Sequence, residues 1–497
     1  MSLSRSRRRF LGKTLALSGG GWLALSGLAG CGGGNDGSNA PTPVDRTVDL
    51  PIPPLVEGRM RADGVRTFTL RMQPGETELV AGLRTATLGY EGAVLGPTLR
   101  MRRGERVRIQ VINAIGEPAT THWHGMHVPA AMDGNPHQTF GDGESWTAEF
   151  DVLNEASTLW YHPHTEGKTG EQVYRGLAGL IRVEDEHADA LGLPSDYGVD
   201  DIPLVIQDRR LRADGGLAYL ETAHDLMGMK GDRFLVNGRE RPRVYLPAQR
   251  VRLRVLNGSN ARIYYLGFED DRPFQVVASD GGLLPEPVTV NRLRMAPAER
   301  FEIVVDLSTD LGRGLWLRSY TGEIVNSLYM ARGLADTFDR GTVDLLRLEV
   351  DRNAIHTSVV PQRLNTIVAL EPNAPDRLFT LEVTNGEFTI NRKPMDMRRI
   401  DERVRLGAVE VWEIRNNQGM LHPFHLHDVQ FQVLSRDGAA PPPVERGWKD
   451  TIAVLPFETV RIVARFADFA DPDVPYMYHC HILEHEDRAM MGQFVVT

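Results

Sequence analysis

The histidines of this chain are concentrated in four short segments, residues 122–125, 160–164, 422–427 and 479–485, which hold ten of the 15 histidines. Four His-x-His pairs lie in them: His122/His124, His162/His164, His425/His427 and His479/His481. In a strand, residues i and i+2 point to the same face, so each pair presents two imidazoles side by side. Neutral imidazole is a natural ligand of copper, and eight imidazoles are too many for one ion. We therefore expect a metal cluster.

A second set of potential ligands surrounds the single cysteine of the last segment. Cys480 lies between His479 and His481, so its side chain leaves the strand by the opposite face. Two imidazoles, a thiolate and a distant thioether form a blue-copper electron-transfer site, and the remaining candidates for that set are His422, His485 and Met490. The backbone of Cys480 would then connect this site to the cluster.

Simpler interpretations exist for each part of this pattern. A single His-x-His is usually a surface pair or a hydrogen-bonded core histidine, and Met490 could be plain core packing. A structural zinc site needs only four ligands in a tetrahedral set. Neither interpretation accounts for all four segments together.

The elements that must position these residues are alternating strands that recur at domain-length intervals. Residues 106–113, 250–257 and 409–416 each alternate and end at asparagine, and each is followed by a second alternating run, at 144–152, 299–307 and 458–466. Such alternation predicts half-buried antiparallel strands. The recurrence predicts an all-β fold of three β-sandwich domains, at residues 45–185, 193–352 and 365–497. The His-x-His pairs come from the first and last domains, so we expect the cluster at their interface.

The N-terminal residues have the features of an export signal. Arg7-Arg8-Arg9 followed by an apolar run resembles a Tat signal peptide over residues 1–30, and the sequence before Cys31 resembles a bacterial lipoprotein cleavage site. Cys31 would then carry lipid, although it could also merely fall in a small-residue cleavage region. Residues 31–44 resemble a flexible tether. We expect a periplasmic protein, anchored to the membrane through Cys31 if that residue carries lipid, in which Cys480 has no cysteine to pair with.

The charge of the chain excludes some classes of partner. The formal net charge is −10. Residues 1–30 contain five basic residues and no acidic ones, so removal of the signal peptide makes the chain still more negative. This disfavours nucleic acid as a partner and suits a soluble protein that meets cations or neutral organic molecules. No transmembrane segment is visible after the signal, and we expect a monomer.

With these residues in view, the chain resembles the multicopper oxidases, in particular the bacterial three-domain type that includes laccases and periplasmic cuprous oxidases. The resemblance covers roughly residues 45–497 and implies three cupredoxin-like Greek-key domains and four copper ions. It also implies the ligands: His422, Cys480, His485 and Met490 for type 1 copper; His122 and His425 for type 2; His124, His162 and His481 for one type 3 copper; and His164, His427 and His479 for the other. All these positions are filled, unlike in division-associated relatives that have lost their ligands.

Two acids match positions where these oxidases place a proton relay, Asp133 and Glu486, although both could be ordinary surface acids. Met420 could contact a substrate or belong to the core. The run 334–381 contains no methionine, so the methionine-rich insertion of cuprous oxidases is incomplete. We therefore expect an oxidase that takes electrons one at a time from phenols, aromatic amines or Cu(I) and reduces dioxygen to water. The alternatives are a copper-sequestering tolerance protein with incidental oxidase activity and a nitrite reductase of related fold, which lacks the full set of paired ligands.

Overall fold

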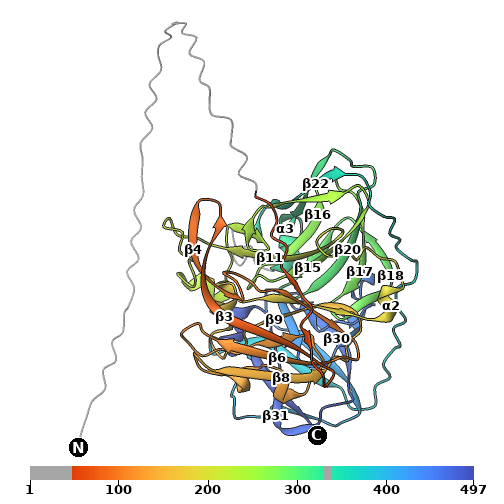
Figure 1. Ribbon diagram of the computed structural model, residues 1–497. Helices are drawn as coiled ribbons and strands as arrows, with labels where there is room; N and C mark the ends of the chain where they lie inside the picture. Colours follow the sequence, from red (N-terminus) through yellow and green to blue (C-terminus); the bar gives the residue numbers. More distant parts are fainter. Residues whose placement is uncertain (1–47, 330–338) are drawn as a thin grey trace, which may run out of the picture. The chain divides into compact units, whose positions relative to one another are not determined.

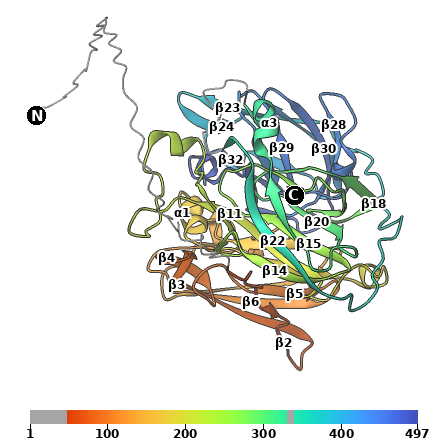
Figure 2. The same cartoon turned by 90° about the horizontal axis from the view of Figure 1, so that it is seen from above.

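The computed structural model describes residues 48–329 and 339–497. The predicted signal peptide, Cys31 and the tether (residues 31–44) lie outside these residues. Within the described ranges the strands form six sheets, which pack in pairs as three sandwiches (Figures 1 and 2). The prediction of an all-β fold is confirmed, whereas the predicted domain boundaries stay a prediction.

The first sandwich encloses a core that includes Leu70, Val107 and Ile181. One sheet has the order β2 (Arg59–Met60), β3 (Val65–Val80), β6 (Arg106–Asn113), β8 (Ser145–Asp151), with β4 (Leu83–Tyr90) paired to β3. The facing sheet has the order β1 (Leu55–Val56), β5 (Thr98–Arg102), β10 (Gly179–Glu184), β9 (Ser157–His162), β7 (His122–His124).

The second sandwich encloses a core that includes Leu253, Ile303 and Leu346. Its first sheet has the order β13 (Arg239–Glu240), β12 (Arg233–Val236), β11 (Asp201–Arg209), β15 (Arg250–Asn257), β20 (Arg300–Asp306), β17 (Phe274–Ser279), β18 (Gly282–Val290). Its second sheet has the order β14 (Arg243–Pro247), β22 (Val343–Arg352), β21 (Gly314–Ser319), β16 (Tyr264–Phe268), β19 (Leu293–Met295).

The third sandwich encloses a core that includes Trp412, Phe424 and Phe494. Its first sheet has the order β24 (Glu387–Ile390), β23 (Arg377–Thr384), β26 (Ala408–Asn416), β30 (Thr459–Phe466), β28 (Phe431–Arg436). Its second sheet has the order β25 (Glu402–Val404), β32 (Met491–Val496), β31 (Asp471–Cys480), β27 (His422–Leu426), β29 (Thr451–Val454).

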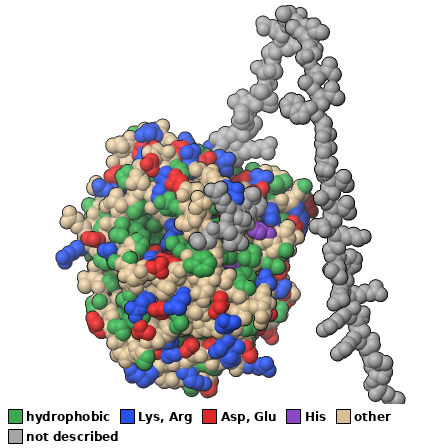
Figure 3. All heavy atoms as spheres, turned by 180° about the vertical axis from the view of Figure 1, so that it is seen from behind, with side chains coloured by type: hydrophobic (Ala, Val, Ile, Leu, Met, Phe, Trp, Pro, Cys, Tyr) green, Lys and Arg blue, Asp and Glu red, His purple; other side chains and the backbone are tan. Residues whose placement is uncertain are grey.

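Helices are short among the described residues. They are α1 (Thr169–Tyr174), α2 (Glu186–Asp189), α3 (Thr321–Leu328) and α4 (Leu483–Glu486), with 3-10 turns η1 (Ala130–Met132), η2 (Pro136–Gln138), η3 (Ala223–Met227) and η5 (Pro443–Glu445). None of the helices in the described ranges is long and apolar enough to cross a membrane. On the face seen in Figure 3, acidic and basic side chains are interspersed, as on a solvated surface.

The internal repeat of the sequence is a repeat of structure. The three alternating runs are β6, β15 and β26, and each pairs antiparallel with the second run that follows it, as β6–β8, β15–β20 and β26–β30. Each also pairs parallel with an earlier strand, β3, β11 or β23. The terminal asparagines Asn113, Asn257 and Asn416 are buried, and each side chain binds the backbone of the turn that follows.

Two of these strands differ from the half-buried strand predicted: β26 is buried on both faces over its first five residues, and β15 over almost its whole length. In β6 only alternate residues are buried, but β15 is buried on both faces. The arginines of its polar face, Arg252 and Arg254, are within hydrogen-bond distance of Glu302, and Arg254 also donates to Thr158 of the first sandwich. The second sandwich therefore packs its charged face against the first, and ion pairs compensate this burial.

Candidate metal centre

Antiparallel pairing of neighbouring strands places the His-x-His pairs side by side. In the first sandwich, β7 pairs with β9 so that His122 lies opposite His162. In the third, β27 pairs with β31 so that His425 lies opposite His479. We call the eight paired histidines the histidine cluster, and all of them are at most 1% exposed.

The first and third sandwiches bring their halves of the histidine cluster together. Nε2 of His479 lies 3.1 Å from Nε2 of His164 and 3.2 Å from Nε2 of His427. The ring of His122 stacks on that of His427, with centroids 4.0 Å apart. The interface site expected from the sequence is therefore present as a set of converging imidazoles.

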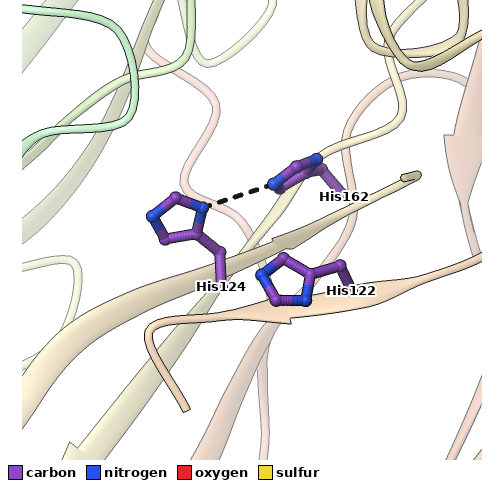
Figure 4. A group of neighbouring side chains, drawn as sticks. All are labelled: His122, His124 and His162. Carbon is purple, nitrogen blue, oxygen red and sulfur yellow. Dashed lines mark hydrogen bonds between the residues drawn. The ribbon is translucent and has the colours of Figure 1, made fainter. Parts of the chain in front are cut away.

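One group of imidazoles has the same members as a predicted ligand set, and the other groups share members with the predicted sets. His164, His427 and His479 have ligand atoms within 4.8 Å of one another. Nε2 of His162 lies 3.4 Å from Nδ1 of His124. A dashed line marks this contact in Figure 4. The ring of His481 has its centroid 5.1 Å from that of His124. The assignment of each group to one copper ion stays a prediction.

Hydrogen bonds on the outer side of the rings fix which nitrogen faces inward. Three rings have Nδ1 at 2.8 Å from the backbone oxygen of another residue. The partner of His122 is Asp133, that of His162 is Pro163 and that of His425 is Asp450. A ring that donates through Nδ1 keeps its lone pair on Nε2. The Nε2 atoms of His122 and His425 are buried and have no hydrogen-bond partner among the described residues. Both nitrogens are therefore free to bind a metal ion, and their assignment to type 2 copper stays a prediction.

Cys480 lies in a second group, on the other face of β31. Its Sγ lies 3.4 Å from Nδ1 of His422 and 3.6 Å from Nδ1 of His485, and the two nitrogens are 3.3 Å apart. We call these three residues the cysteine triad. The centre of such a triangle lies roughly 2 Å from each corner, which is a normal metal–ligand distance. The donor set therefore fits a copper ion.

Protonation in the cysteine triad also suits a metal. Burial lowers the pKa of His422 to about 3, so its imidazole is neutral at physiological pH. Burial raises the pKa of the Cys480 thiol, which therefore keeps its proton until a metal displaces it. The ring of Phe388 stacks on His485 with centroids 3.7 Å apart, and the backbone oxygen of Met227 lies 3.2 Å from Nε2 of His485.

The two predicted methionines are both buried. Met490 is fully buried, and its backbone oxygen accepts a hydrogen bond from the amide of Cys480. Met420, 7% exposed, forms a β-bridge with Tyr329 and belongs to the core of the third sandwich. The ligand role of Met490 and the substrate contact of Met420 stay predictions.

Asp133 and Glu486 are not surface acids, so the alternative that they are ordinary solvated side chains is wrong. Oδ2 of Asp133, whose side chain is fully buried, accepts a hydrogen bond from Nδ1 of His427 at 2.8 Å. The oxygens of Glu486 lie 3.3 Å from Nδ1 of His164 and 3.1 Å from Nδ1 of His479. Both carboxylates therefore contact the outer nitrogens of the histidine cluster.

Asp450 is a third carboxylate beside the histidine cluster, and it was not among the residues predicted from the sequence. Asp450, which is 1% exposed, precedes β29, and its Oδ1 lies 3.0 Å from Nε2 of His124. A lone aspartate before a strand gives no local signal, because the contact joins residues of different sandwiches.

Comparison with known proteins agrees with this geometry. Family models described as multicopper oxidase match residues 71–188, 214–327 and 363–497. The chain belongs to the multicopper oxidase family. It is therefore a copper-dependent oxidoreductase that uses dioxygen as acceptor and takes electrons from small-molecule or metal-ion reductants, and the family binds four copper ions.

Three relatives indicate the range of the family. The multicopper oxidase mco of Staphylococcus haemolyticus is 38% identical, covering 90% of this chain and 92% of the relative. The cell division protein FtsP of Yersinia pestis is 35% identical, covering 100% and 99%. One solved structure is that of CueO, a laccase-like multicopper oxidase from Ochrobactrum sp. with oxidase activity towards lignin model compounds and lignosulfonate. It is 39% identical, with a TM-score of 0.81, and the match covers 90% of this chain and 100% of that one.

Proposed function

We propose that this protein takes electrons from phenols or aromatic amines at the cysteine triad and passes them along β31 to the histidine cluster, where dioxygen is reduced to water. One observation carries the proposal: Cys480 belongs to the cysteine triad while its neighbours His479 and His481 belong to the histidine cluster. The path between the two sites is then a few covalent bonds of one strand.

The ligands that we assign are those of the sequence analysis. The cysteine triad with Met490 would hold type 1 copper, His122 and His425 would hold type 2, and the remaining six imidazoles would hold the type 3 pair. Bound copper supplies the one-electron oxidation of the reductant and the electrons for dioxygen reduction. The fit rests on buried imidazole nitrogens without a partner in the described ranges and on the size of the cysteine triad.

Two carboxylates would move the protons that the reduction consumes. Glu486 lies against Nδ1 of His164 and of His479, and Asp133 accepts from Nδ1 of His427, so each carboxylate reaches the histidine cluster from its outer side. A carboxylate can hold a proton there and release it inward.

Aromatic reductants fit the surroundings of the cysteine triad better than Cu(I). Two groups contact the ring of His485: the phenyl ring of Phe388, which stacks on it, and the backbone oxygen of Met227, which lies near its Nε2. The run 334–381 has no methionine to supply soft thioether ligands for Cu(I). The Ochrobactrum relative acts on lignin model compounds, whereas a Campylobacter jejuni relative, 29% identical, is titled a metallo-oxidase.

A second candidate is a copper-tolerance protein that sequesters copper and whose oxidase activity is incidental. The FtsP relatives, which are named for cell division, are the observation that keeps a function other than oxidation open, since the Yersinia pestis protein is 35% identical over 100% of this chain. The filled ligand positions favour the oxidase.

We further propose that the protein is exported by the Tat pathway to the periplasm, is anchored through a lipid on Cys31 and acts as a monomer. The support is the twin-arginine sequence and the small residues before Cys31. Cys31→Ala should move the protein from the membrane fraction to the soluble periplasmic fraction, and a Cys31→Ala protein that stays with the membrane contradicts the anchor.

The experiment that tests the function is steady-state oxygen consumption by the copper-loaded protein with a phenol, an aromatic amine and Cu(I) in turn. We expect turnover with the aromatic reductants and about four electrons consumed per dioxygen. Copper binding without oxygen uptake would support sequestration, and turnover with Cu(I) alone would reject the aromatic substrate class.

A further inference from the structure

The second sandwich supplies none of the assigned copper ligands, yet one of its side chains lies among residues that contact them. Arg300 begins β20, which packs against β9, the strand that ends at His162. Its side chain is fully buried. A buried guanidinium is costly unless its charge and its five N–H donors are all paired.

All five donors of Arg300 have acceptors, and these come from all three sandwiches. Nε donates to the backbone oxygen of Thr158 in the first, at 3.1 Å. The two terminal nitrogens donate to the backbone oxygens of Ala298 (2.9 Å) and Asp280 (3.0 Å) in the second. They also donate to both carboxylate oxygens of Asp450 in the third. Such a two-pronged contact fixes the plane of the carboxylate.

Asp450 in turn contacts two imidazoles of the histidine cluster. Its Oδ1, 2.8 Å from Arg300, lies 3.0 Å from Nε2 of His124. Its backbone oxygen lies 2.8 Å from Nδ1 of His425. Because the carboxylate cannot donate, the proton of this contact belongs to Nε2 of His124. The lone pair of His124 is then on Nδ1, which faces Nε2 of His162 (Figure 4).

This orientation sets His124 apart from its neighbours. His122, His162 and His425 are held through Nδ1 and turn Nε2 inward. His124 is held through Nε2 and turns Nδ1 inward. The carboxylate of Asp450 is the anionic acceptor that favours this tautomer of His124, and Oγ1 of Thr451, which donates to the same carboxylate, lies 3.3 Å from the same Nε2.

The chain also leaves space for this pair. Gly125 follows His124 with φ at +86°, and a Cβ there would lie 2.7 Å from Oδ2 of Asp450 and 2.8 Å from a nitrogen of Arg300. Only glycine combines this backbone conformation with so close an approach.

We propose that Arg300 is a positioning residue, which fixes Asp450 and through it the ring and tautomer of His124, so that the second sandwich orients a ligand of the type 3 pair. The inference rests on the proposed copper assignment. Mutation of residues that support a metal ligand in this way typically lowers metal affinity or activity by about 10–100-fold. Lysine in place of Arg300 would keep the charge but lose the planar fork.

The test compares Arg300→Lys with Arg254→Lys in the full, copper-loaded chain. Arg254 is a matched control because it is also buried, donates to Thr158 and pairs with Asp201 and Glu302, with no histidine among these partners. The measurements are copper bound per chain, the EPR spin count, the blue absorption and thermal unfolding of the apoprotein. EPR detects isolated Cu(II) ions but not a coupled pair, so it reports on the type 3 site directly.

We expect Arg300→Lys to weaken copper binding at the type 3 pair about 10–100-fold, or to uncouple the pair and raise the spin count, while the blue absorption persists. Arg254→Lys should match the wild type in all three copper measurements. A wild-type spin count and copper content in Arg300→Lys would overturn the proposal, and so would equal losses in Arg254→Lys, because these would mean general loosening of the interface.

A second variant covers the case in which Arg300→Lys does not fold. Asp450→Asn keeps the size and the backbone oxygen but removes the negative charge and replaces one acceptor oxygen with an amide N–H donor, and it should change the EPR spectrum in the same direction. An unchanged Asp450→Asn spectrum would also overturn the proposal. Failure of the proposed function would be visible separately, as a wild-type protein without blue absorption or without an EPR-silent pair.

Discussion

His479 and Cys480 are neighbours in the chain, but their side chains leave β31 on opposite faces and belong to different sites. Nε2 of His479 lies 3.1 Å from His164, and Sγ of Cys480 lies 3.4 Å from His422. The strand alternation that separates them also joins the two sites covalently.

Glu486→Gln should slow dioxygen reduction by roughly 100-fold, because an amide cannot hold and release a proton. The blue absorption should not change, since Glu486 lies against His164 and His479 and not against the cysteine triad. Reoxidation of the reduced protein by dioxygen in a stopped-flow instrument measures this step. Unchanged reoxidation would remove Glu486 from the proton path.

Asp133→Asn should lower turnover about 10–100-fold, because it removes the negative charge that accepts from Nδ1 of His427. The exposed acid Asp142 of the same sandwich provides the control, and Asp142→Asn should leave turnover as it is. Oxygen uptake at equal copper content compares the two. Equal rates in both variants contradict the role of Asp133.

His127 should stabilise the contact between the first and third sandwiches in a pH-dependent way. Its Nδ1 lies 2.7 Å from Asp428 and its Nε2 lies 3.2 Å from Asp468. Burial lowers the pKa of His127, but the two carboxylates outweigh burial and raise it to about 9. An unfolded histidine has a pKa of about 6.5, so this stabilisation is complete below about pH 6.5 and is lost as the pH rises to about 9.

Denaturant unfolding at the two ends of this pH range measures the effect of His127. The free energy of unfolding of the wild type should fall by about 1–3 kcal/mol more than that of His127→Gln between them. Parallel pH profiles for the two proteins would show that His127 is not protonated in the folded state.

Asn257→Ala should destabilise the second sandwich by about 2–4 kcal/mol, because it leaves buried backbone groups without partners. The amide of Asn257 donates to the backbone oxygens of Arg262 and Met295, and its oxygen accepts from the amide of Ser259. Thermal or denaturant unfolding measures the loss. The control is Asn326→Ala, at an exposed position of α3, which should change the free energy of unfolding by less than about 0.5 kcal/mol. An equally small change for Asn257→Ala would contradict the prediction.

Much of the fold could be predicted because alternation is a local property of the sequence. The run 106–113 coincides with β6 and 250–257 with β15, and the histidine pairs share a face because i and i+2 always do in a strand. The buried polar face of β15 could not be predicted, because it depends on contact with another sandwich.

The convergence of the eight paired histidines could be predicted because they stand in pairs close together in the sequence. Asp450 and Arg300 could not, because each is a single charged residue whose partners lie far away in the chain, 326 residues away for Asp450 and His124. The support around a metal centre is assembled by tertiary contacts, and these have no sequence pattern of their own.

The most direct test of the central claim is the absorption spectrum and oxygen uptake of Cys480→Ser after copper loading. Serine removes the thiolate but keeps the strand, so the histidine cluster should still bind its copper. We predict that the intense blue absorption and steady-state turnover both disappear, while about three of the four copper ions remain bound. If either the blue absorption or turnover survives this substitution, electrons do not enter through Cys480, and the account is wrong.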